Sequence, residues 1–153
     1  MDNELTFIML CGVPGCGKST YAASLATKFN AKIVCLDTIR EELYGDANIL
    51  GGNEVYNKAK SLIKEYLEAG ISVIYDATNT RIKSRGKTLR IVNDYNCKKI
   101  AIHIDTPLDI SISRNNHRDR VVPKGVIVRF YNDFQEPTID EGFDEVKIIN
   151  NNN

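Results

Sequence analysis

The chain has 153 residues, 42% of them apolar, which allows one globular domain with a buried core. Lys plus Arg and Asp plus Glu number 20 each, so the formal net charge is zero and the chain is not a strongly basic protein overall. Local basic patches stay compatible with nucleic acid. The four cysteines form no CxxC pair, so neither a structural zinc site nor a disulfide framework is indicated.

The first predicted strand and helix enclose a glycine-rich loop. Leu5–Cys11 is an apolar run with the length of a buried strand, and Lys18–Phe29 has helical apolar spacing. The intervening Gly12–Ser19 reads GVPGCGKS and fits the GxxxxGK[ST] phosphate loop without a mismatch. Backbone N–H groups and the helix dipole of such a loop hold phosphates. The strand before it and the helix after it exclude a chance glycine-rich turn.

This phosphate loop predicts ATP and Mg²⁺ as cofactors. Lys18 is expected to reach the β- and γ-phosphates and to act in catalysis, and Ser19 is expected to bind Mg²⁺. Cys16 stands where such loops often carry Ser or Ala, and we expect it to lie against the phosphates as a tolerated small residue. The predicted ATP-binding residues of the loop are Gly12, Pro14, Gly15, Cys16, Gly17, Lys18, Ser19 and Thr20.

The second predicted strand, Lys32–Leu36, is followed at once by an acidic residue. Asp37 opens a short helix through Tyr44, at the sheet edge where ligands of α/β proteins bind. An aspartate that opens a helix is most often only an N-cap, so catalytic and capping roles both remain open. Arg40 lies on the same helical face, and Asn53–Gly70 forms a longer amphipathic helix with glycine at its end.

The third predicted strand, Ile71–Tyr75, also ends in an acid. Asp76 follows it in the arrangement typical of a carboxylate that holds Mg²⁺ or its waters, although an aspartate can also simply begin a turn. Asn79 is a candidate for positioning the acceptor. A helix is predicted over Ile82–Tyr95. Residues 81–90, at its start, hold five basic side chains and no acid, which fits either a basic binding face or a solvated helix face.

The remaining chain continues the alternation of strands and helices. Lys98–Ile104 is the fourth strand, Thr106 and Pro107 begin a helix, Val121–Lys124 interrupts it, Val126–Phe134 resumes it, and Glu145–Ile149 is a last short strand. The alternation predicts a P-loop α/β three-layer sandwich, with a parallel sheet of about five strands, helices on both faces and a C-terminal lid.

Two arginines precede the interruption and are predicted to belong to the lid. Arg114 and Arg118 are four residues apart on a predicted helix, and a lid arginine can stabilise charge on transferring phosphate oxygens. Arg120 is a possible stand-in, and a basic helix face is the alternative.

Domain organisation is predicted to be simple, with one domain over residues 1–149 and a frayed tail over 150–153. The sequence shows no charged-then-apolar leader and no apolar run of about 18 residues. We therefore expect a soluble protein without membrane contact in the cytoplasm, or in the host cytoplasm if a phage encodes it. The oligomeric state stays open.

Several segments together resemble the 5′-hydroxyl polynucleotide kinase family. They are Gly12–Thr20, Leu36–Arg40, Asp76–Asn79, Arg114–Arg120 with Val122-Pro123, and Phe134–Phe143 with its F-x-x-P-x-x-x-E-G-F pattern. The resemblance covers essentially the whole chain. No DxDGT segment of that family's phosphatase module is present, so the chain resembles a stand-alone kinase module.

The resemblance implies roles for individual residues. Asp37 is implied to be the general base that contacts the acceptor 5′-hydroxyl, and Arg40 to hold a phosphate of the acceptor strand. Arg118 is implied to be the lid arginine at the ATP phosphates, with Arg114 beside it. The family often has arginine immediately before the aspartate, whereas this chain has Leu36. That departure weakens the implied acceptor-phosphate site.

The expected function is transfer of the γ-phosphate of ATP to 5′-OH ends of DNA or RNA. Two alternatives remain: a kinase of a small molecule such as a nucleoside or a sugar, and a non-catalytic nucleotide-dependent binding module. The predicted acceptor-binding residues are Asp37, Arg40, Asp76 and Asn79, and the predicted metal ligands are Ser19 and Asp76.

Overall fold

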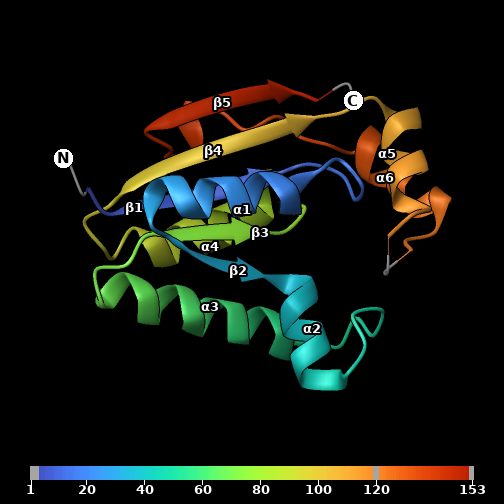
Figure 1. Ribbon diagram of the computed structural model, residues 1–153. Helices are drawn as coiled ribbons and strands as arrows, with labels where there is room; N and C mark the ends of the chain where they lie inside the picture. The colour runs from blue at the N-terminus through green and yellow to red at the C-terminus, as the bar shows by residue number, and fades with distance from the viewer. Residues whose placement is uncertain (1–3, 119–120, 152–153) are drawn as a thin grey trace.

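A five-stranded parallel sheet forms the centre of the computed structural model, which describes residues 4–118 and 121–151 (Figure 1). The strands are β1 (Thr6–Cys11), β2 (Lys32–Cys35), β3 (Val73–Asp76), β4 (Lys98–Asp105) and β5 (Glu145–Asn150). The helices are α1 (Lys18–Phe29), α2 (Leu36–Tyr44), α3 (Asn53–Glu68), α4 (Ile82–Val92), α5 (Leu108–Asn115) and α6 (Lys124–Asn132), with a short 3₁₀ helix, η1 (Ile139–Glu141). The strand order is β2-β3-β1-β4-β5.

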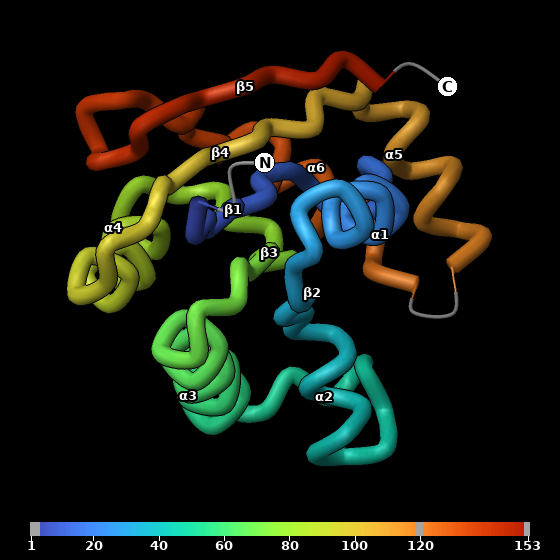
Figure 2. Tube along the Cα trace, turned by 60° about the vertical axis from the view of Figure 1, so that its left-hand side comes forward, coloured from blue at the N-terminus to red at the C-terminus, as the bar shows by residue number. Residues whose placement is uncertain are grey.

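Helices cover both faces of this sheet, as the alternating pattern predicts. Successive residues of β1 point to opposite faces, and all six are buried. Phe7 and Met9 pack with α3 and α4, whereas Ile8 and Leu10 pack with α1 and α6. Figure 2 separates α1 on one side of the sheet from α3 and α4 on the other. The three-layer α/β fold of P-loop proteins is thereby confirmed.

The chain end is more ordered than the sequence suggested. β5 continues to Asn150, and the backbone N–H of Asn151 donates to the carbonyl of Asp105 at 2.9 Å. The expectation of a frayed tail from residue 150 is therefore wrong for Asn150 and Asn151, because pairing with β4 extends further than the apolar run. Residues 152 and 153 lie outside the described part of the chain.

The loops at the carboxyl ends of the parallel strands meet at one edge of the sheet. The phosphate loop follows β1, α2 follows β2 without a connecting loop, and Asp76 ends β3. Ligands of open α/β sheets bind at this edge. Among the described helices, none has both the length and the apolar character that crossing a bilayer requires.

Candidate active site

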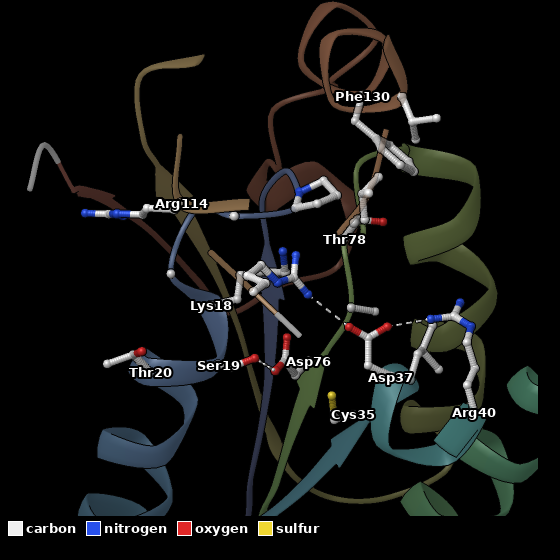
Figure 3. A pocket seen from close by; sticks show the side chains of 18 of the residues that line it. Lys18, Ser19, Thr20, Cys35, Asp37, Arg40, Asp76, Thr78, Arg114 and Phe130 are labelled. Atoms are coloured by element: carbon white, nitrogen blue, oxygen red, sulfur yellow. Dashed lines mark hydrogen bonds and ion pairs between the residues drawn. The ribbon is translucent and has the colours of Figure 1, made fainter. Parts of the chain in front are cut away.

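A cavity of about 440 Å³ opens at the carboxyl edge of the sheet (Figure 3). The phosphate loop, α2, the end of β3, α5 and α6 all contribute side chains to it. Its lining consists of Pro14, Gly15, Gly17, Lys18, Ser19, Thr20, Cys35, Leu36, Asp37, Arg40, Leu50, Asp76, Ala77, Thr78, Arg114, Arg118, Val122, Val126 and Phe130. Most of the residues predicted from the sequence are thus brought to one place.

Glycines shape the phosphate loop. Gly15 and Gly17 have φ of +84° and +101°, a region that side-chain-bearing residues rarely adopt. A Cβ on Gly15 would also collide with the backbone carbonyl of Ser111. The Lys18 ammonium bends back over the loop and donates to the carbonyls of Gly12 and Val13, both at 3.1 Å. Gly15, Gly17 and the Lys18 side chain therefore line one side of the cavity.

Ser19 and Asp76 face each other beside this loop. The Ser19 hydroxyl donates to Oδ2 of Asp76 at 3.0 Å, and Asp76 is only 5% exposed. A hydroxyl and a carboxylate held together beside a phosphate loop are hard oxygen ligands of the kind Mg²⁺ accepts along with phosphates and water. This pair fits the predicted Mg²⁺ site.

Asp37 lies on the opposite side of the cavity between two arginines. Its carboxylate accepts from Arg40 at 2.8 Å and from Arg118 at 3.2 Å (Figure 3). α2 begins at Leu36 with Cys35 as its N-cap, so Asp37 stands in the first turn. The alternative that Asp37 is merely an N-cap is therefore wrong. Its carboxylate is part of the cavity wall instead.

The two predicted lid arginines are placed differently from each other. Arg114 lies in the last turn of α5 and donates to the carbonyl of Cys16, in the phosphate loop, at 3.3 Å. Arg118 lies beyond the end of α5, in a bend, and reaches across the cavity to Asp37. The expectation that both stand on one helix is wrong, because α5 ends at Asn115. Arg120 lies outside the described residues.

Three predicted residues stand apart from the cavity lining. Cys16 is fully buried in the apolar cluster beneath the loop, so the expectation that its side chain lies against the phosphates is wrong. Gly12 lies above it, and a Cβ on Gly12 would meet the Cys16 sulfur at 2.6 Å. Asn79 has φ of +45° and donates to the carbonyl of Leu10 at 2.8 Å, which ties β1 to the segment after β3.

Cys35 is the cysteine that lines the cavity, but its thiol is not set up as a nucleophile. Burial, together with the nearby Asp76 carboxylate, raises the pKa of the Cys35 thiol above its ordinary value. The protonated thiol then prevails at neutral pH. Burial also raises the pKa of Cys11 to about 12, so this thiol stays neutral in the core.

The segment predicted to be a lid has contacts that the sequence analysis missed. Asn115 is 1% exposed and clamps Val122 through two hydrogen bonds, of 2.6 Å and 2.9 Å. The two bonds join the last residue of α5 to a residue just before α6. Val122, Val126 and Phe130 then line the cavity at intervals of four residues, a helical spacing visible in the sequence.

A buried ion pair supports the segment that follows β3. Arg85 is 0% exposed, and its Nε and Nη2 donate to the two carboxylate oxygens of Glu141 at 2.8 Å and 3.2 Å. Arg85 also donates to the carbonyl of Asn79 at 2.8 Å. One of the five basic residues in 81–90 is therefore structural, which neither of the two interpretations of that segment included.

Comparisons with known proteins place the chain among P-loop proteins. A family model described as an AAA domain matches residues 7–137. The L-seryl-tRNA(Sec) kinase of Methanococcus maripaludis is 30% identical over 141 residues, which cover 85% of this chain and 52% of that protein. The bifunctional polynucleotide phosphatase/kinase of Schizosaccharomyces pombe is 26% identical over 147 residues, which cover 93% of this chain and 33% of that protein.

A solved structure shows the same fold. A chain of the Pnkp1/Rnl/Hen1 RNA repair complex superimposes with a TM-score of 0.76 at 20% identity, covering 87% of this chain and 45% of that one. Of the two sequence relatives, the chain spans about half the length of the L-seryl-tRNA(Sec) kinase and about a third of the length of the polynucleotide phosphatase/kinase. At such identity the structural likeness supports the fold alone.

Proposed function

The chain belongs to the AAA domain family, and from this membership and the cavity we propose that it transfers the γ-phosphate of ATP to 5′-hydroxyl ends of DNA or RNA. The observation that carries this proposal is the position of Asp37. Its carboxylate lies in the same cavity as Lys18, on the opposite wall, between Arg40 and Arg118. A carboxylate there can accept the hydrogen bond of an acceptor hydroxyl in line with a γ-phosphate held by the loop.

The residues of the cavity divide the work of the reaction. The phosphate loop and Lys18 bind the phosphates, and Ser19 with Asp76 would hold Mg²⁺, which when bound neutralises phosphate charge. Asp37 orients the acceptor hydroxyl. A bond forms between the acceptor oxygen and the γ-phosphorus as the bond to the β,γ-bridging oxygen breaks, ADP leaves, and the hydroxyl proton passes to Asp37.

Arg118 supplies the charge that this step needs. Its guanidinium contacts Asp37 at 3.2 Å and lines the cavity, so a γ-phosphate bound there is a second anion within its reach. Charge spreads over the γ-oxygens in the loose transition state, and an arginine beside them stabilises it. The apolar α6 side chains Val126 and Phe130, with Val122 before them, limit the access of water, which would compete with the acceptor.

A second candidate acceptor comes from the comparisons. The relative with 30% identity is named as a kinase of L-seryl-tRNA(Sec), and a seryl group, like a 5′-end, offers a primary hydroxyl attached to nucleic acid. Leu36, beside Asp37 in the cavity wall, supplies no positive charge for an acceptor phosphate, which suits an acceptor without a phosphate beside its hydroxyl, such as a seryl group.

One assay with several acceptors tests the proposal. The protein is incubated with Mg²⁺ and γ-labelled ATP and, separately, with 5′-OH DNA, 5′-OH RNA, seryl-tRNA, a nucleoside and a sugar. We expect label on the 5′-OH oligonucleotides and none with Lys18→Ala. Label on seryl-tRNA or a small molecule alone would replace the polynucleotide acceptor, and ATP binding with transfer to none would make the chain a binding module.

A further inference from the structure

A second cavity, of about 200 Å³, adjoins the first on the side of α3 and α4. The two share Leu36, Ala77 and Thr78 in their linings, so they lie side by side at the residue that precedes Asp37. A ligand with its reactive hydroxyl at Asp37 can therefore extend into the second cavity. The phosphate loop contributes nothing to that second lining.

An aromatic ring and an ammonium group meet in the second cavity. The Lys87 ammonium, from α4, lies 5.7 Å from the centre of the Tyr56 ring, from α3. The Tyr56 hydroxyl is 3.2 Å from the hydroxyl of Thr88, which holds the ring in place between the two helices. Tyr56 is half-buried and Lys87 is exposed, so the pair is both ordered and accessible.

Positive charge continues from this cavity along the surface of α4. Lys83, Lys87 and Arg90 are all exposed and lie at helical intervals of four and three residues, on one face. Within the described ranges, none of the three forms an ion pair with a carboxylate. Arg85 takes no part in this face, because it is buried and neutralised by Glu141. The face therefore suits a polyanion.

We propose that the second cavity and this α4 face bind the acceptor strand behind its 5′-end, with a base on Tyr56 and backbone phosphates on Lys87 and Lys83. The inference rests on the proposed kinase function and specifies its acceptor as a polynucleotide. Aromatic rings stack any base, and lysines beside them track the phosphates of single strands. A nucleoside or a sugar would leave this aromatic and basic path without a role.

Binding of a 3′-fluorescein-labelled, short 5′-OH oligodeoxynucleotide, followed by anisotropy, tests the proposal independently of transfer. Tyr56→Leu is expected to weaken binding about 5- to 150-fold, the range for loss of one stacked base, whereas Tyr56→Phe keeps the ring and loses far less. Lys87→Gln should lower the slope of log Kd against log salt concentration by about 0.7. Melting temperatures identify any variant that has lost its fold.

Lys28→Gln is the matched control, because Lys28 lies over Phe29 at the same 5.7 Å but at the end of α1. It should leave oligonucleotide affinity and salt slope unchanged. In transfer assays, the preference for an oligonucleotide over a nucleoside 3′-phosphate should fall with Tyr56→Leu and persist with Lys28→Gln.

The outcomes separate this inference from the proposed function. The second-cavity site is overturned if Lys28→Gln weakens oligonucleotide binding as much as Lys87→Gln does. It is also overturned if a folded Tyr56→Leu protein binds the oligonucleotide as tightly as the unchanged protein. Either result would count against the site even if 5′-OH ends are phosphorylated. Binding that depends on Tyr56 without any transfer supports the site and overturns the kinase proposal.

Discussion

The carboxylate of Asp37 is held by charge rather than by helix capping. It accepts from Arg40 and Arg118, in a cavity that also contains Lys18 (Figure 3). Two guanidinium groups keep the carboxylate oriented, but they also compete with any acceptor hydroxyl for its oxygens. In the proposed mechanism, a bound γ-phosphate would draw Arg118 toward itself and away from Asp37. The two ion pairs thus fix both the charge around the Asp37 carboxylate and its orientation in the cavity.

Asp37→Asn is expected to reduce phosphate transfer by about 10²–10⁴-fold, the usual contribution of a general base, while ATP binding persists. An amide can turn its NH₂ toward the acceptor and cannot take up its proton. Transfer rates under saturating ATP and ATP affinity by calorimetry check this. Asp109→Asn is the control, because Asp109 also stands in the first turn of a helix, α5, but outside the cavity lining. Full activity of a folded Asp37→Asn protein would remove Asp37 from the mechanism.

A buried ion pair joins α4 to the segment around η1. Arg85 on α4 and Glu141 in η1 are 0% and 7% exposed, and Glu141 also accepts from the backbone N–H of Thr138 at 2.8 Å. The same arginine holds the carbonyl of Asn79, next to Thr78, whose own carbonyl accepts from the N–H of Gly12. Through Arg85 and the segment after β3, the F-x-x-P-x-x-x-E-G-F segment therefore supports the start of the phosphate loop at Gly12.

Glu141→Gln is expected to lower the free energy of unfolding by about 3–5 kcal/mol, because it leaves the Arg85 charge buried without its partner. Urea unfolding measures the change. Glu145→Gln removes the carboxylate from an exposed pair with Lys98 at 3.0 Å and should have a much smaller effect, because water screens that pair. Equal losses in the two variants would contradict a special role for the buried pair.

The cavity joins both halves of the sheet edge. The phosphate loop follows the central strand β1, α2 follows the edge strand β2, and α5 follows β4 on the other side (Figure 1). A ligand that contacts all three favours the folded chain over the unfolded one, since the unfolded chain has no such site.

Mg²⁺ with ATP at about 100 times its Kd should therefore add about 2.7 kcal/mol of stability and raise the melting temperature by about 5–10 °C. Differential scanning fluorimetry measures the shift. Lys18→Ala should abolish most of it, and Asp76→Asn should reduce the part that depends on Mg²⁺. An equal shift in all three proteins would indicate that the nucleotide binds elsewhere.

Local patterns in the sequence determined the fold and half of the site. The informative patterns lie within short stretches of sequence, where spacing alone specifies strand, loop and helix. They are the phosphate loop Gly12–Thr20, the five predicted strands, and Asp37 and Asp76 after the second and third strands. The carboxyl ends of parallel strands then meet necessarily, so the sequence alone places Lys18, Ser19, Asp37 and Asp76 at one edge of the sheet.

Contacts between distant residues were decided only by the tertiary structure. Arg118 and Asp37 are 81 positions apart, Arg85 and Glu141 are 56 apart, and Tyr56 meets Thr88 across 32. A pattern of polar and apolar residues reports how exposed each position is, but it does not say which side chain faces which. Cys16 illustrates the limit: the motif placed its backbone at the phosphates, and only the packing under α1 turned its sulfur into the core.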